Sequence, residues 1–284
     1  MRIGIIGYGF VGKALAQAFV DSVEIYKVDP KLDTNINNLI EFEPDVIFVC
    51  LPTPMSDDGT QDISIVKNTL LEIKKIGLKG ILVLKSTVHP GNIEELQSIH
   101  PNIVYNPEFL REKHAIDDLI NSNLIVFGGD SDSSSYISEV YCNYTKCTNK
   151  DHIFTDVMTA SLLKYTINSF LATKVIFFNE FKNLFDAIDA NDSWENFIRY
   201  ISRDKRIGSS HMMVPGHDGR HGFGGACLPK DANAIIKYSQ NIKIDLNLLE
   251  NVIKTNNKIR ASYDDETHRE HEQNINYNSR KEEL

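Results

Sequence analysis

Cys227 stands where a thiol could act as a nucleophile. It follows the glycine-rich run Gly222-Phe-Gly-Gly-Ala226 and precedes a helix that we expect to begin around Pro229–Asp231. A thiol just before a helix start, with the cation of Lys230 three residues on, lies in a positive potential that favours the thiolate. The glycines would let a substrate approach closely. The alternative is a small buried hydrophobic residue, the commoner fate of a lone cysteine, but the polar, glycine-rich surroundings argue against it.

A glycine motif, Gly7-x-Gly9-x-x-Gly12, lies near the N-terminus between an apolar run and a stretch with helical spacing. In a dinucleotide-binding βαβ unit the first glycine makes the tight turn, the second admits a pyrophosphate, and the third lets the helix pack on the strand. Asp29 ends the next β-rich piece, about twenty residues on, where such a site has an acid for the ribose hydroxyls. Because a carboxylate repels a 2′-phosphate, Asp29 favours NAD over NADP.

Two pairs of polar residues are spaced four apart, and the spacing leaves two interpretations open for each pair. Lys164 and Asn168 share one face of a predicted helix, where they could hold an oxyanion together or simply face solvent. Glu108 and Glu112 follow a predicted strand, and they could transfer protons or be ordinary acids at a helix start.

The sequence predicts no metal site. Cys142 and Cys147 bracket four residues but have no second pair of ligands, so a zinc site is not expected. The nine histidines show no ligand spacing such as HExxH, and we expect them at the surface. Cys50 lies inside an apolar strand and is predicted to belong to the core.

The elements that must position these residues alternate between β and α over the first half of the chain. Helix-compatible stretches such as 63–76 separate the strand-like runs, and this alternation implies a parallel sheet. The predicted strands are 1–6, 23–28, 45–51, 80–85, 103–105 and 124–127. Strand signals stop near residue 155. The predicted fold class is therefore α/β, with an N-terminal Rossmann-like doubly wound sheet (1–154) followed by an all-α domain (155–260).

The second half of the chain reads as helices joined by polar loops. The predicted helix 156–189 carries more apolar surface than the flank of one small domain needs, so part of it is expected to face another subunit. A polar loop, 207–225, precedes further predicted helices around 229–231 and 245–254. The last stretch, 261–284, contains seven acids and three Lys or Arg, so we expect a polar tail, either a solvated helix extension or disordered.

Composition excludes several classes of protein. The 284 residues are about two domains' worth, and 42% hydrophobic with 24% charged residues is ordinary for a globular protein. A net charge of −9 argues against nucleic acid as a partner. No apolar run reaches the length of about 20 residues that a membrane span needs. The few cysteines and the absence of a leader-like start predict a cytoplasmic protein.

Taken together, the motifs resemble the UDP-glucose/GDP-mannose dehydrogenase family, and most closely its UDP-glucose branch. They occur in the family's order over residues 1–260. The matching motifs are Gly7-Tyr-Gly-Phe-Val-Gly12, Val49-Cys-Leu-Pro-Thr-Pro54 with Asp58-Gly59, Lys85-Ser-Thr-Val88, Asn106-Pro-Glu-Phe-Leu-Arg-Glu112, Lys164-Tyr-Thr-Ile-Asn168, Arg206-Ile-Gly208 and Gly222–Asp231.

The resemblance implies a nucleotide-sugar substrate whose primary alcohol is oxidised to a carboxylate at the expense of NAD⁺. It implies that Cys227 is the nucleophile that traps the aldehyde as a thiohemiacetal, from which a second hydride transfer gives a thioester that water hydrolyses. In the UDP-glucose branch this is the four-electron oxidation of UDP-glucose to UDP-glucuronate.

The resemblance also gives roles to residues whose spacing left them open. Catalytic matches are Cys227, Lys164 and Asn168 (oxyanion), Asp231 and Thr87 (water or base), and Glu108 and Glu112 (proton transfer). Matches to cofactor contacts are Gly7, Gly9, Phe10, Val11, Gly12, Asp29, Thr53, Thr87, Glu112 and Lys230. Matches to substrate contacts are Glu108, Phe109, Leu110, Arg111, Glu112, Lys164, Asn168, Arg206, Gly222, Phe223, Gly224 and Gly225. Arg206 matches an arginine that reaches the neighbouring subunit's site, so the resemblance implies a homodimer through the central helices.

The sequence departs from the family at its C-terminal end. Family members continue beyond the helix that ends near Arg260 into a second Rossmann-like domain that supplies much of the UDP pocket, whereas a polar stretch follows here. We therefore expect either a shortened enzyme or one whose missing domain comes from a separate chain. Three alternatives remain open: a dehydrogenase for UDP-N-acetylmannosamine or GDP-mannose, a non-catalytic NAD-binding partner of a full-length enzyme, and a 3-hydroxyacid dehydrogenase, which shares the Lys–Asn helix pair but needs no thiol.

Overall fold

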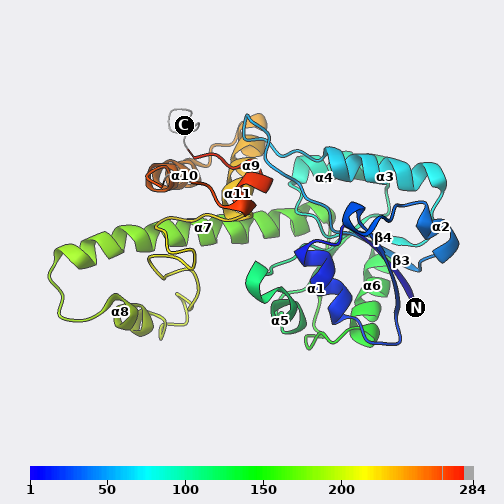
Figure 1. The fold of residues 1–284 in the computed structure, drawn as a ribbon, viewed down its shortest axis with the longest axis horizontal. Coiled ribbons are helices and arrows are strands. Elements are labelled where there is room, and N and C mark those ends of the chain that lie inside the picture. The colour runs from blue at the N-terminus through cyan, green and yellow to red at the C-terminus, as the bar shows by residue number, and fades with distance from the viewer. Residues whose placement is uncertain (264, 278–284) are drawn as a thin grey trace. The chain divides into compact units, whose positions relative to one another are not determined.

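The computed structural model of this chain describes residues 1–263 and 265–277, and the chain divides into two compact units (Figure 1). The first unit comprises residues 1–53 and 62–164, and the second comprises residues 54–61 and 165–284. The change between the units lies at residue 165, compared with the predicted residue 155, and the segment 54–61 belongs with the second unit.

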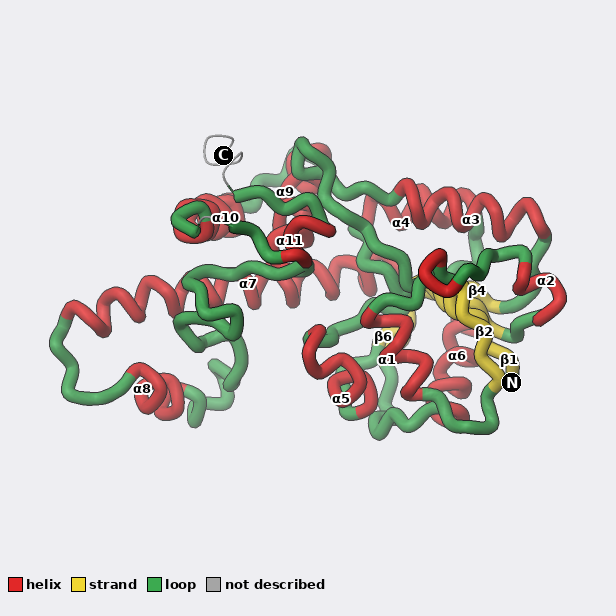
Figure 2. Tube along the Cα trace, in the orientation of Figure 1, coloured by secondary structure: helices red, strands yellow, loops and turns green. Residues whose placement is uncertain are grey.

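The first unit is built on a sheet, whose strands are yellow in Figure 2. In the described part of the chain this sheet has seven strands in the order β2-β1-β3-β4-β5-β6-β7. All neighbours are parallel except β5 and β6, which pair antiparallel through Tyr105 and Gly128. The strands are β1 (Arg2–Ile6), β2 (Glu24–Val28), β3 (Val46–Val49), β4 (Ile81–Leu84), β5 (Val104–Tyr105), β6 (Val126–Gly128) and β7 (Ile153–Thr155).

Alternate strand residues supply two hydrophobic cores, one on each face of this sheet. In β3, Ile47 and Val49 belong to one core, whereas Val46 and Phe48 belong to the other. This period-two alternation is what a strand buried on both faces requires. The helices of this unit are α1 (Phe10–Ala18), α2 (Asn38–Phe42), α3 (Ser64–Ile76), α4 (Pro90–Ile99), α5 (Ala115–Ile120) and α6 (Ser131–Tyr144), with short 3₁₀ turns η1 (Pro30–Leu32) and η2 (Glu112–His114).

The predicted fold class is confirmed, with two differences in detail. The parallel sheet predicted from the β/α alternation is wrong for the pair β5 and β6, which are antiparallel. Strand β7 was not predicted at all. Ile153 and Phe154 are 44% and 52% exposed, so this edge strand lacks the apolar burial pattern that marks the other strands in the sequence.

The second unit is helical. Its long helix α7 (Val157–Ala187) begins in the first unit and confirms the helix predicted over 156–189. The other helices are α8 (Trp194–Ile201), α9 (Leu228–Asn241), α10 (Asn247–Arg260) and α11 (His268–Glu272). One core joins α7, α9 and α10, and a second, aromatic core joins the end of α7 to α8 around Trp194. None of the helices in the described ranges has the length and apolar character needed to cross a membrane.

The C-terminal segment differs from the expectation of a solvated or disordered tail. Residues 265–277 fold back onto the second unit, with Ile275 and Tyr277 buried against Met55. Thr267 and Glu270 form a capping box that starts α11. These few contacts could not be predicted from the acidic composition of 261–284, because an average composition does not show which individual side chains are buried or hydrogen-bonded. Residue 264 and residues 278–284 of the predicted tail lie outside the described residues.

Candidate active site

The glycine turn lies at the carboxyl end of β1, where the sheet order reverses between β2 and β3. Gly7 has φ of +92° and its N–H donates to the carbonyl oxygen of Val28 at 2.8 Å. Gly9 is the extended N-cap of α1, and Phe10, Val11 and Gly12 are the first residues of that helix. Its first N–H groups therefore point out of the carboxyl edge of the sheet, where open α/β folds bind nucleotides.

Asp29 lies next to this turn, as the sequence predicted for a ribose-binding acid. One carboxylate oxygen accepts the backbone N–H of Tyr8 at 2.7 Å, and the other accepts that of Lys31 at 2.9 Å. These bonds hold the carboxylate at the end of β2 while leaving further lone pairs on both oxygens.

Thr53 and Thr87 lie beyond the ends of the next two strands, β3 and β4. The Thr53 hydroxyl donates to the carbonyl oxygen of Thr87 at 2.8 Å, and both side chains are buried. Apart from Glu112, the predicted cofactor residues of the first unit thus follow the carboxyl ends of four adjacent strands, β2, β1, β3 and β4.

Glu108 and Lys164 form a buried ion pair within the first unit. Their exposed fractions are 6% and 3%, and the Lys164 Nζ lies 3.5 Å from the Glu108 Oε1. Lys164 also donates to the backbone oxygen of Glu108, while the Glu108 Oε2 accepts the N–H of Leu110 at 2.6 Å. Phe109 lies under the ammonium, with its ring centre 5.3 Å from the Nζ. The lysine is therefore charge-paired rather than facing solvent.

Glu112 has a different environment from Glu108. It is exposed at the start of η2, and Arg111 beside it is exposed and paired with Asp118 at 2.7 Å. Residues 106–111 form no helix, so the two glutamates do not share a helix face. The four-residue spacing alone could not reveal this difference in burial.

Cys227 is the N-cap of α9, and its carbonyl oxygen accepts the N–H of Asp231 at 2.9 Å. The side chain is half-buried and is a thiol rather than half of a disulfide. The predicted helix start around Pro229–Asp231 is thus confirmed, with Leu228 as the first helical residue. The thiol stands at the positive end of a 14-residue helix.

Asp231 connects two other predicted residues of the second unit. It is 1% exposed; its Oδ1 lies 2.5 Å from the Lys230 Nζ and its Oδ2 accepts the Asn168 side-chain amide at 2.6 Å. Asn168 of α7 therefore forms one buried cluster with Lys230 and Asp231 of the first turn of α9, the helix that Cys227 caps. Thr87, the other residue predicted to position water, belongs to the first unit.

The glycines before Cys227 are explained largely by packing within the protein. A Cβ on Gly222 would lie 2.6 Å from the Asn256 Oδ1, and one on Gly224 would collide with Arg260 and Glu270. Gly225, with φ of +76°, has open space beside it. Phe223 is buried in the core of the second unit. Of these three glycines, only Gly225 has open space beside it through which a substrate could approach the backbone.

Arg206 lies in the loop after α8, largely exposed, and its guanidinium pairs with Asp204 at 2.6 Å. Within one chain it contacts no other predicted site residue through a hydrogen bond or ion pair of the described part of the structure.

Cys50 and Lys85, at the ends of neighbouring strands, are among the groups whose pKa values are shifted by desolvation. Desolvation raises the pKa of the Cys50 thiol to about 12, which keeps it protonated at neutral pH. Desolvation also lowers the pKa of Lys85, whose Nζ donates to the Asn106 side chain at 2.8 Å. Lys85 belongs to one of the sequence motifs, yet spacing gave no indication of this buried position. In the described ranges, no group of three or more His, Cys, Asp or Glu side chains is arranged to hold a metal ion.

Comparisons with known proteins agree with this geometry. Residues 25–145 match the NAD binding domain of the UDP-glucose/GDP-mannose dehydrogenase family, and residues 158–258 match its central domain. The UDP-glucose 6-dehydrogenase of Rickettsia prowazekii (strain Madrid E) is 30% identical over 303 residues, covering 92% of this chain and 68% of the relative. That of Rickettsia bellii (strain RML369-C) is 34% identical over 220 residues, 75% of this chain and 49% of the relative.

A solved structure has the same fold. The UDP-glucose dehydrogenase of the archaeon Pyrobaculum islandicum superimposes with a TM-score of 0.73 at 24% identity, covering 90% of this chain and 68% of that one. Both family domains, the chain length covered in the first relative and the sheet-plus-helix architecture point the same way. The chain belongs to the UDP-glucose/GDP-mannose dehydrogenase family, and its first unit contains that family's NAD-binding domain.

Proposed function

We propose that this chain oxidises UDP-glucose to UDP-glucuronate with NAD⁺, through a covalent intermediate on Cys227. The observation that carries the proposal is a thiol at the N-cap of α9, whose first turn contributes Lys230 and Asp231 to the buried cluster with Asn168. A simple 3-hydroxyacid dehydrogenase needs no thiol in this position. The relatives named UDP-glucose 6-dehydrogenase support this substrate.

The carboxyl edge of the sheet is suited to the dinucleotide. The N-cap position of Gly9 has no atom within 4 Å of where a Cβ would lie, so a pyrophosphate could approach the backbone there. Asp29 would accept the ribose hydroxyls with its remaining lone pairs. Bound NAD⁺ would supply the hydride acceptor for both oxidation steps.

In the proposed reaction, different side chains act in successive steps. A carboxylate, Glu108 or Glu112, accepts the proton of the primary alcohol as the carbon loses a hydride and becomes an aldehyde. The Cys227 thiolate adds to the aldehyde carbon, and the resulting oxyanion is stabilised by Lys164 and Asn168. Loss of a second hydride converts this thiohemiacetal to a thioester.

Hydrolysis then completes the reaction. A water positioned by Asp231 and Thr87 attacks the thioester carbonyl while one of its protons passes to the Asp231 carboxylate. The carbon–sulfur bond breaks and releases the Cys227 thiolate, and the product acid loses the second proton to solvent and becomes the carboxylate. Four electrons in total leave the sugar carbon as two hydrides. The burial of Asp231 and its bonds to Asn168 and Lys230 fix its orientation for this role.

We further propose a cytoplasmic homodimer formed through α7, with Arg206 reaching the neighbouring subunit. Four large side chains repeat at intervals of seven, four and three residues along one face of α7: Phe170, Phe177, Phe181 and Leu184. They are between 41% and 62% exposed in the single chain. An apolar stripe of this spacing is typical of a helix–helix interface.

Substitution of two glycines tests the cofactor site. Gly9→Ala should leave the melting temperature unchanged, since the space is open and φ is −75°, but weaken NAD⁺ binding about ten-fold or more by blocking the pyrophosphate. Gly12→Ala should instead destabilise the first unit by about 3 kcal/mol, because its Cβ would collide with the Gly7 carbonyl. Calorimetric titration and thermal denaturation measure the two effects. An unchanged affinity of Gly9→Ala for NAD⁺ would mean that the pyrophosphate does not bind at the Gly9 backbone.

A stoichiometric assay tests the thiol. The wild-type chain with excess NAD⁺ should release two NADH per UDP-glucose, followed by absorbance. Cys227→Ser should lower the rate by about 10³-fold or more, because a neutral hydroxyl is a much weaker nucleophile than a thiolate. Cys142→Ser, a half-buried cysteine of α6, is the matched control and should behave as wild type. A full yield from Cys227→Ser is incompatible with the mechanism. Turnover of UDP-N-acetylmannosamine or GDP-mannose instead of UDP-glucose would show that the substrate is that other nucleotide sugar.

A charge on the apolar face tests the dimer. Phe170→Glu should convert the protein from dimer to monomer in sedimentation velocity, because a carboxylate would be buried in the interface. Leu248→Glu alters a residue of α10 that is 71% exposed and should leave the dimer intact. A wild-type chain that sediments as a monomer would rule out the homodimer.

A further inference from the structure

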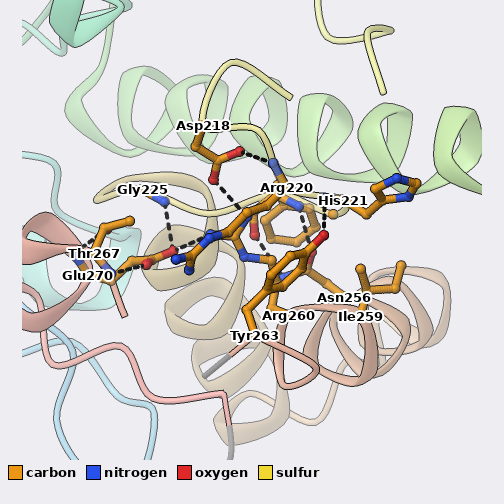
Figure 3. A network of polar contacts seen from close by, with 12 residues as sticks. Asp218, Arg220, His221, Gly225, Asn256, Ile259, Arg260, Tyr263, Thr267 and Glu270 are labelled. Carbon is orange, nitrogen blue, oxygen red and sulfur yellow. Dashed lines mark hydrogen bonds and ion pairs between the residues drawn. The ribbon is translucent and has the colours of Figure 1, made fainter. Parts of the chain in front are cut away.

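Glu270, in the C-terminal segment, is fully buried and holds several parts of the second unit together. Its Oε1 accepts hydrogen bonds from the Arg260 guanidinium at 2.9 Å and the backbone N–H of Gly225 at 3.2 Å (Figure 3). The same oxygen accepts a hydrogen bond from the Tyr277 hydroxyl at 2.8 Å. Its Oε2 accepts the N–H of Thr267 at 2.7 Å. The side chain of Glu270, 45 residues beyond Gly225 in the chain, is thus bonded directly to the loop that leads to Cys227.

Arg260 fixes the other end of the same loop. Its guanidinium, which is 0% exposed, pairs with Asp218 at 2.7 Å as well as with Glu270 (Figure 3). Tyr263 and Tyr277 lie beside it, with ring centres 5.8 and 5.6 Å away. The loop from 218 to 225 is therefore attached at its start through Asp218 and at its end through Gly225.

The network depends on charge. Burial by itself raises the pKa of Glu270, but hydrogen bonds from Thr267 and Tyr277 and the charge of Arg260 outweigh it, so the pKa lies below its ordinary value. Glu270 is therefore a carboxylate at neutral pH. Gly224 has no side chain at the point where Arg260 and Glu270 meet, which is what allows them to approach the loop backbone.

The position of the loop determines where the thiol stands. Gly225, with φ of +76°, is two residues before Cys227, and the chain enters α9 directly afterwards. The C-terminal segment also contacts the segment 54–61 of this unit, where the N–H of Met55 donates to the carbonyl oxygen of Gln273 at 3.2 Å. The segment that carries Glu270 is thus held by hydrogen bonds both before this residue, at Thr267, and after it, at Gln273.

We propose that Glu270 is a positioning residue for the thiol chemistry: through Gly225 and the Arg260–Asp218 pair it holds the loop 218–225 in the conformation that carries Cys227 at the start of α9. This inference rests on the proposed function of Cys227. It assigns a role in the reaction to the C-terminal segment.

Two measurements on the full chain test it. Hydrogen–deuterium exchange of peptides covering 218–227 should be about ten-fold faster in Glu270→Ala, since the Gly225 N–H loses its acceptor. In NADH assays the same variant should lose about ten-fold in kcat with the KM for NAD⁺ unchanged, because the thiol, not the cofactor site, is displaced. Glu270→Gln, which keeps an oxygen acceptor and the shape, should lie between Glu270→Ala and wild type and remains informative if the alanine variant unfolds.

Two control variants separate this role from general stabilisation of α11. Glu272→Gln removes the carboxylate that pairs with Arg269 in the same helix, and Thr267→Ala removes the hydroxyl half of the capping box while leaving Glu270 in place. Both should show wild-type exchange in 218–227 and wild-type kcat.

Each outcome decides the inference. Wild-type exchange of the loop in both Glu270 variants overturns it, and so does faster exchange with unchanged kcat. If the wild-type chain releases no NADH with any nucleotide sugar, the proposed function fails, and the exchange rates alone then decide whether Glu270 holds the loop.

Discussion

Ion pairs between buried charges organise the functional parts of both units. Lys164 and Glu108 neutralise one another in the first unit, and Asp231 meets Lys230 in the second. An ion taken out of water without a partner costs several kcal/mol, and removing one member of such a pair typically destabilises a protein by about 3–5 kcal/mol. The side chains proposed to act on the substrate are therefore restricted to few conformations before any ligand arrives.

This restriction suits the proposed chemistry. An oxyanion or a thioester carbonyl is stabilised best by groups that need no reorganisation during the reaction. The amide of Asn168 is oriented by its bond to Asp231, and the ammonium of Lys164 by its bonds to Glu108. The sheet imposes a comparable order on the cofactor residues, because the carboxyl ends of neighbouring parallel strands lie along one edge.

Much of the fold could be predicted from local patterns. Strands β1, β3 and β4 are apolar runs buried on both faces, the glycine turn has its own geometry, and α9 begins where Pro229 and Asp231 indicate. Strand β7 was not predicted, because its exposed side chains do not form a buried apolar run of the kind seen in β1, β3 and β4. Helix α8 also escaped, although Ser193 is a good N-cap and Trp194, Phe197 and Ile198 have helical spacing.

The site was predictable to the extent that its residues lie in motifs. Spacing could not distinguish the buried Glu108 from the exposed Glu112, because the turn between them is set by tertiary contacts. The network around Arg260 could not be predicted from local patterns either, because Asp218 and Arg260 are 42 residues apart in the chain. The one local signal was the Thr267-x-x-Glu270 pattern of a capping box, which marks a helix start inside the acidic stretch.

The central claim is that Cys227 becomes covalently bonded to the oxidised sugar. The most direct measurement mixes the chain with NAD⁺ and UDP-glucose, quenches the reaction in acid at successive times, and analyses the cysteine-containing peptides by mass spectrometry. The mechanism predicts a transient UDP-glucuronyl thioester on the peptide bearing Cys227 and none on those bearing Cys50, Cys142 or Cys147. Accumulation of NADH while the Cys227 peptide stays unmodified at every time would contradict it.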